Sequence, residues 1–234
     1  MAERRATLVL LPGLDGTEIF FRPLRAALPP RIRVRCLEYP TSGSNDYRAL
    51  LPLVREACLA CEDFVVLGWS FSGPLALMLA AEAPPRLRGV ILCASFIAPP
   101  WPLARLLRHA VRAPVARMFP LASRALAFFG RYSSAEFRRD RQECLSRVPL
   151  SVFAARTQAI LQMDLGARPS CGVPVLYVAG SSDIVVPGWN ARAVTRALPS
   201  ARVVTIEGPH LALYTNPARA AEVIAGFIDE YASA

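Results

Sequence analysis

Short apolar runs alternate with longer helical patterns along most of this 234-residue chain. Several runs are continuous and partly β-branched, which is typical of strands that are covered on both faces. Strands are predicted at residues 7–11, 32–37, 64–68, 89–94, 173–179 and 202–206. Helical patterns lie between them, at residues 20–28, 47–59, 75–83, 190–198 and 218–231. This alternation predicts an α/β fold with a mostly parallel sheet and helices on both faces.

Two segments depart from this alternation of buried strands and helices. Residues 31–36 alternate arginine with apolar side chains, which predicts a strand near an edge of the sheet with one wet face. From residue 97 to 165 there is no strand pattern, only helical segments punctuated by prolines. We therefore expect a helical cap insertion at 97–165 on a core formed by residues 1–96 and 166–234.

The segment from Val65 to Pro74 carries the sharpest chemical signal. An apolar strand runs into Gly68-Trp69-Ser70-Phe71-Ser72 and then into a helical pattern. A nucleophile elbow needs this strand–turn–helix context, with small residues two places before and after the serine. Ser72 stands where glycine is usual, and its small side chain fits the same demand. The pattern predicts Ser70 as a nucleophile.

A serine hydroxyl needs a general base, and the chain has only two histidines. His109 lies among arginines in the predicted cap and is interpreted as a surface or packing residue. His210 follows the last predicted strand, and open α/β sheets keep their sites at the carboxyl ends of strands. His210 is therefore the predicted base.

The orienting acid is expected on the loop after the preceding strand. Asp183 lies there, and the chain order Ser70, Asp183, His210 is compatible with a nucleophile elbow on an α/β fold. Asp164 is the alternative, but it precedes its strand, where a solvated or capping role is expected.

The loop Pro12-Gly13-Leu14-Asp15-Gly16 follows the first strand and supplies a candidate site for an oxyanion. We expect the backbone N–H groups of Leu14 and Phe71 to donate to it. The other interpretation is a plain glycine-rich turn. Since the loop lacks the G-x-G-x-x-G spacing, a dinucleotide site is not indicated.

These four motifs together resemble the α/β-hydrolase family from Leu8 to about Phe227. The resemblance implies acyl transfer to water, with attack by Ser70, proton transfer through His210 and orientation of the imidazole by Asp183. A serine at the apex of the turn differs from the aspartate of haloalkane dehalogenases and soluble epoxide hydrolases. The predicted enzyme is a carboxylesterase-type serine hydrolase acting on a small-molecule ester or thioester.

Positive charge is concentrated in the predicted cap. All 27 basic residues are arginine, and ten of them lie in residues 101–147 against three acidic residues, so this segment carries +7 of the net charge of +9. One interpretation is a solvated helical face. The other is an electrostatic dock for an acidic acyl-carrier protein, with Arg105, Arg108 and Arg112 on one helical stripe. At the level of fold, the short cap resembles the carrier-protein methyl ester esterases of biotin synthesis.

Aromatic side chains of the elbow and the cap are candidates for lining an acyl pocket, although the same side chains fit a plain hydrophobic core. The candidates are Trp69, Phe119, Phe128, Phe129, Phe137 and Phe153.

Composition excludes several other classes. The absence of lysine rules out Schiff-base, pyridoxal-phosphate and P-loop lysines, and no cofactor or metal is expected. The six cysteines are scattered, and Cys58 and Cys61 fall in a helical pattern, so we expect free thiols.

No nucleic-acid-binding motif is present, so no nucleic-acid partner is expected. Gly73-Pro74 divides the longest uncharged run, so no membrane span is predicted. The amino-terminal apolar run is too short for a signal peptide, which favours a cytoplasmic protein.

Two further classes of function stay open at this level. Other serine-triad reactions use the same residues: carbon–carbon bond hydrolysis, lactone opening, peptidase and acyltransferase chemistry. A non-catalytic ligand sensor on the same fold is the third class, but an oriented base serves no purpose in a pure binder. The sequence gives no indication of the oligomeric state.

Overall fold

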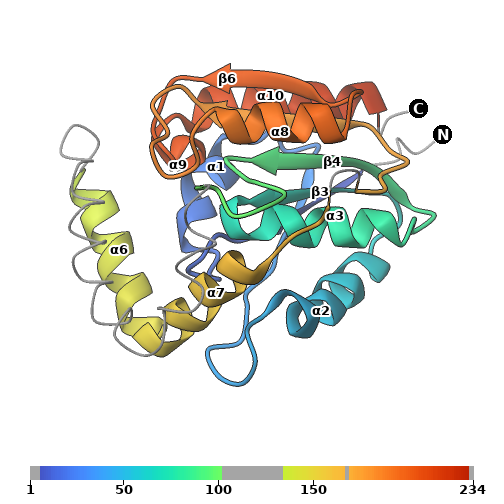
Figure 1. Ribbon diagram of the computed structural model, residues 1–234. Coiled ribbons are helices and arrows are strands. Elements are labelled where there is room, and N and C mark those ends of the chain that lie inside the picture. The colour runs from blue at the N-terminus through green and yellow to red at the C-terminus, as the bar shows by residue number, and fades with distance from the viewer. Residues whose placement is uncertain (1–5, 102–133, 167–168, 232–234) are drawn as a thin grey trace.

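The computed structural model describes residues 6–101, 134–166 and 169–231 (Figure 1). Residues 102–133 of the predicted cap therefore lie outside the described residues. The same holds for the predicted docking and pocket residues within it: Arg105, Arg108, His109, Arg112, Phe119, Phe128 and Phe129.

The core is a six-stranded, fully parallel sheet in the order β2-β1-β3-β4-β5-β6. Its strands are β1 (Thr7–Leu11), β2 (Arg33–Cys36), β3 (Phe64–Trp69), β4 (Leu87–Cys93), β5 (Val175–Gly180) and β6 (Arg202–Ile206). All six predicted strands are confirmed. The arginine-rich β2 lies at the edge, as its alternation predicted, while β3 is buried along its whole length.

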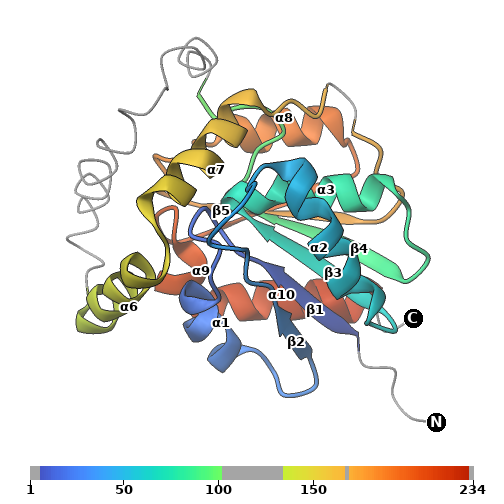
Figure 2. The ribbon, with the colours of Figure 1, turned by 90° about the horizontal axis from the view of Figure 1, so that it is seen from below.

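Helices cover both faces of the sheet (Figures 1 and 2). One face carries α2 (Tyr47–Leu59), α3 (Gly73–Ala81) and α8 (Trp189–Ala197), and the other carries α1 (Arg22–Ala27) and α10 (Pro217–Tyr231). The short α9 (Ala212–Thr215) precedes α10. The predicted helix at 20–28 is divided into a 3-10 turn η1 (Ile19–Phe21) and α1, because Pro23 is suited to a helix's first turn.

Two helices of the predicted cap are described, α6 (Ala135–Arg147) and α7 (Leu150–Gln162). Ser134 caps α6 by accepting a hydrogen bond from the Phe137 N–H, and Pro149 separates the two helices. Both lie beyond the carboxyl ends of the strands, opposite the chain termini (Figure 1). The division into core and cap remains a prediction.

Polar and ionic contacts, one of them to a buried carboxylate, attach α6 to the core. Asp140 is 3% exposed and accepts hydrogen bonds from Arg22 (3.0 Å) and from the Tyr214 hydroxyl (2.9 Å). Arg147 pairs with Glu38 at 2.8 Å. The position of α6 over the sheet end is therefore fixed by charge as well as by apolar packing.

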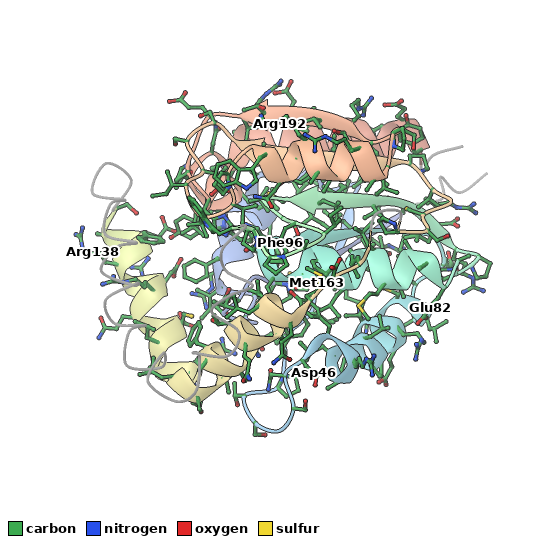
Figure 3. The ribbon with its side chains drawn as sticks, in the orientation of Figure 1. Asp46, Glu82, Phe96, Arg138, Met163 and Arg192 are labelled. Atoms are coloured by element: carbon green, nitrogen blue, oxygen red, sulfur yellow. The ribbon has the colours of Figure 1, made fainter. Side chains whose placement is uncertain are left out.

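Apolar and charged side chains separate as expected for a globular chain. Figure 3 shows Phe96 and Met163 inside the molecule and Arg138 and Arg192 at its periphery. Within the part of the chain that the structure describes, none of the helices has the length and apolar character needed to cross a membrane. The cysteines are free thiols, as predicted.

Candidate active site

The central strand β3 ends in a tight turn that holds Ser70. This residue has a φ of 51°, in the left-handed region that L-residues seldom adopt, and it begins the 3-10 turn η2 (Ser70–Ser72) before α3. Such backbone strain at a single serine between a strand and a helix is the geometry of a nucleophile elbow.

Small residues make the turn possible. A Cβ on Gly68 would overlap the backbone carbonyl of Ser72, and a Cβ on Gly73 would overlap the Ser95 hydroxyl. The Ser95 hydroxyl instead donates to the Ser70 carbonyl at 2.7 Å, and the Tyr177 hydroxyl donates to the Ser95 carbonyl at 2.7 Å. Ser95 and Tyr177 support the strained turn, and the sequence patterns gave no sign of this role.

The structure brings the three predicted residues of the triad into one hydrogen-bonded chain. His210 Nε2 lies 2.9 Å from Ser70 Oγ, and His210 Nδ1 lies 2.9 Å from Asp183 Oδ2. The other carboxylate oxygen of Asp183 accepts from the N–H groups of Val185 and Val186 at 2.9 and 2.8 Å. An Nδ1–H bonded to the carboxylate leaves Nε2 as the acceptor for the serine hydroxyl.

The loops that carry Asp183 and His210 are joined to each other. The Ser182 N–H donates to the Gly208 carbonyl at 3.0 Å, and a Cβ on Gly180 would overlap the Pro209 carbonyl. The two loops therefore cannot separate without breaking backbone contacts.

The alternative acid lies elsewhere. Asp164 is exposed and accepts a hydrogen bond from Gly166 N–H within its own loop at 2.9 Å. Asp183 is therefore the carboxylate beside the histidine.

The predicted oxyanion donors lie at the same end of the sheet. In the register between β1 and β3, Leu11 is opposite Gly68, so the Pro12–Gly16 loop and the elbow emerge side by side. The Leu14 N–H has no hydrogen-bond partner among the residues that the structure describes. Phe71 lies in the first turn of η2, where N–H groups lack intrahelical partners. Both donors remain predictions.

An apolar cavity of about 230 Å³ opens next to Ser70 and His210. Of the predicted pocket residues, Trp69, Phe137 and Phe153 line it. The cavity is also lined by side chains that were not expected from the sequence: Phe20, Phe96, Leu145, Ile160, Val186 and Leu211. Phe96 could have been found, because it follows β4 at the functional end of the sheet.

The other ionisable groups of the cavity are poor competitors for the role of nucleophile. Burial raises the pKa of the Cys144 thiol to about 12, so the thiol stays protonated at neutral pH. Burial also raises the pKa of Asp15, opposed by hydrogen bonds from Thr17. Among the described residues, no group of three or more metal-ligating side chains is present.

Several known proteins are similar to this chain in sequence. The model of the alpha/beta hydrolase family matches residues 8–223. A pimeloyl-[acyl-carrier protein] methyl ester esterase of Xanthomonas oryzae is 29% identical over 222 residues, covering 86% of each chain. The polyketide synthase ThaQ of Burkholderia thailandensis is 27% identical over 253 residues, covering 97% of this chain and 12% of ThaQ. The chain therefore spans a small part of that relative.

A solved hydrolase from Pseudomonas aeruginosa has the same fold. It superposes with a TM-score of 0.78 at 21% identity, covering 97% of this chain and 91% of that one.

Proposed function

The chain belongs to the alpha/beta hydrolase family, and we propose that it cleaves a carboxylic ester or thioester through an acyl-enzyme on Ser70. The observation that carries the proposal is the continuous chain of 2.9 Å contacts from Asp183 through His210 to the strained serine. Its position at the mouth of an apolar cavity supports an acyl substrate over a small polar one.

The proposed reaction has two halves. Ser70 Oγ attacks the carbonyl carbon while its proton passes to His210 Nε2, and the carbonyl oxygen becomes an oxyanion near the Leu14 and Phe71 amides. The intermediate then collapses, the bond to the leaving alcohol or thiol breaks, and His210 returns the proton to that group. Water repeats the sequence on the acyl-enzyme and releases the acid.

The size of the cavity predicts a preference among acyl chains. Because its walls are mostly apolar and its volume is about 230 Å³, activity should rise from acetyl to medium-length linear chains and fall for longer ones. A series of p-nitrophenyl esters and matched acyl thioesters tests this through kcat/KM. Equal rates across the series would mean that the cavity is not the acyl pocket, and no turnover of any member would contradict the proposed function.

The arginine-rich segment supports a second, narrower proposal, that the acyl group arrives on an acidic carrier protein. Its support is the +7 charge of residues 101–147 together with relatives named as esterases of a carrier-protein ester. Electrostatic docking of this kind raises the rate of association more than the affinity and weakens with salt.

Charge reversal tests the docking proposal. The test is a triple variant that carries Arg105→Glu, Arg108→Glu and Arg112→Glu. It should have a kcat/KM for a carrier-bound acyl ester lower by about tenfold or more at low salt. Its kcat/KM for a small p-nitrophenyl ester should be unchanged. The matched control reverses three exposed arginines elsewhere, Arg33, Arg35 and Arg48, for the same change in net charge. If kcat/KM for the carrier-bound ester falls equally in both variants, or in neither, the carrier protein does not dock on the arginines of the predicted cap.

A further inference from the structure

Arg156 is an arginine without solvent exposure, and it lies next to the candidate oxyanion loop. It comes from α7, and its side chain is 0% exposed. Asn45, which is 2% exposed, accepts hydrogen bonds from Arg156 Nε at 3.0 Å and Nη2 at 2.8 Å. Nη2 also donates to the Pro40 carbonyl at 3.1 Å. A buried guanidinium is tolerated only where its donors are satisfied, so Asn45 and the backbone determine its orientation.

The remaining guanidinium nitrogen binds the loop itself. Arg156 Nη1 donates to the carbonyls of Leu14 at 3.0 Å and Asp15 at 2.6 Å. A Cβ on Gly16 would overlap the guanidinium, and Gly16 has a φ of 70°. The loop and the arginine are therefore fitted to each other, with glycine at the one position where a side chain would displace the guanidinium.

These contacts determine where the predicted oxyanion donor points. The Leu14 N–H belongs to the same peptide unit as the Gly13 carbonyl, and in a trans peptide the two point in opposite directions. The Gly13 carbonyl accepts from the Gly16 N–H at 3.0 Å, which closes a turn around Leu14 and Asp15. Arg156 holds the two carbonyls inside that turn, so the orientation of the Leu14 N–H depends on it.

The start of the loop is held by the same cluster. The Ser72 hydroxyl donates to the Pro12 carbonyl, so the Tyr39 hydroxyl, 2.6 Å away, must donate to Ser72. The Arg156 guanidinium lies over the Tyr39 ring, 5.5 Å from its centroid. Ser72, at the place where glycine is usual in the elbow motif, thus connects the elbow to the oxyanion loop.

We propose that Arg156 is a positioning residue that holds the Pro12–Gly16 loop in the conformation required for oxyanion stabilisation. It does not touch the substrate. The inference rests on the proposed function, because it assigns Arg156 to the transition state of that reaction. Since α7 also lines the cavity through Phe153 and Ile160, Arg156 links the helical insertion to the oxyanion site.

The test compares Arg156→Met and Arg156→Lys with wild type, using a p-nitrophenyl ester and an acyl trifluoromethyl ketone. This ketone forms a tetrahedral adduct with serine whose oxyanion needs the same donors. Arg156→Met should lower kcat by about 10- to 100-fold with KM near the wild-type value, and weaken ketone binding by the same factor. Arg156→Lys retains the charge but lacks the planar set of guanidinium donors. Its kcat and its affinity for the ketone should therefore lie between those of wild type and Arg156→Met. Ethylguanidinium should partly restore kcat in Arg156→Gly.

The matched control is Arg88→Met, which removes an arginine paired with Asp63 at 2.7 Å at the start of β4, at the opposite end of the sheet from the loop. It should leave kcat unchanged. If Arg156→Met does not fold, Asn45→Ala removes the partner that orients the guanidinium and should lower kcat in the same direction.

The outcomes separate the two proposals. A purely structural role would lower thermal stability or raise KM without changing kcat or ketone affinity, and that result would overturn the assignment of Arg156. Absence of ester turnover by the wild type would instead overturn the proposed function, and this inference with it.

Discussion

Replacing Ser70 with alanine is expected to lower kcat for an activated ester by about 10⁶-fold, because no acyl-enzyme can form. The side chain is small and 8% exposed, and its loss removes only the contact with His210 Nε2. Neither the cavity walls nor the Ser95 bond to the backbone of the elbow depends on the hydroxyl. The variant should therefore fold and bind substrate as the wild type does.

Labelling with a fluorophosphonate measures the same prediction without a known substrate. The wild-type protein should bind one fluorophosphonate per chain, and the Ser70→Ala variant should bind none. Ser200→Ala, which removes an exposed serine in the loop after α8, is the matched control and should label as wild type. Labelling that persists in Ser70→Ala would assign the nucleophile to another residue.

The proximity of Ser70, Asp183 and His210 could be predicted because the signals for their positions are local. Continuous apolar strands, glycine two places before Ser70 and the position of His210 after a strand all depend on neighbours in the sequence. Parallel topology then places the ends of β3, β5 and β6 along one edge of the sheet. That is why residues 140 positions apart, Ser70 and His210, could be paired without coordinates.

Arg156 could not be predicted in this way. In the pattern Ala154-Ala155-Arg156-Thr157, an arginine on a helix is expected to face solvent. Its burial depends on Asn45 and on carbonyls from two distant loops, which only tertiary packing brings together. Ser72 presents the same difficulty, because its sequence position indicates only that it is small, whereas its hydroxyl connects two segments of the site.

Asp183→Asn is expected to lower kcat by about 10⁴-fold, with KM little changed. The reason lies in the two backbone N–H groups of Val185 and Val186, which donate to Asp183 Oδ1. They require an oxygen at that position, so the amide NH₂ of asparagine would face His210 Nδ1. An imidazole that accepts at Nδ1 carries its proton on Nε2, where it cannot accept the proton of Ser70.

Asp164→Asn is the matched control for this prediction. It makes the same change in charge and shape at the alternative acid, which is exposed and bonded within its own loop. Its kcat should equal that of wild type, and both variants should keep the wild-type thermal midpoint closely enough for rates to be compared. If Asp164→Asn loses activity while Asp183→Asn retains it, the orienting acid is not the one beside His210. A large loss in Asp183→Asn that appears only in KM would mean that the carboxylate acts in binding and does not set the histidine tautomer.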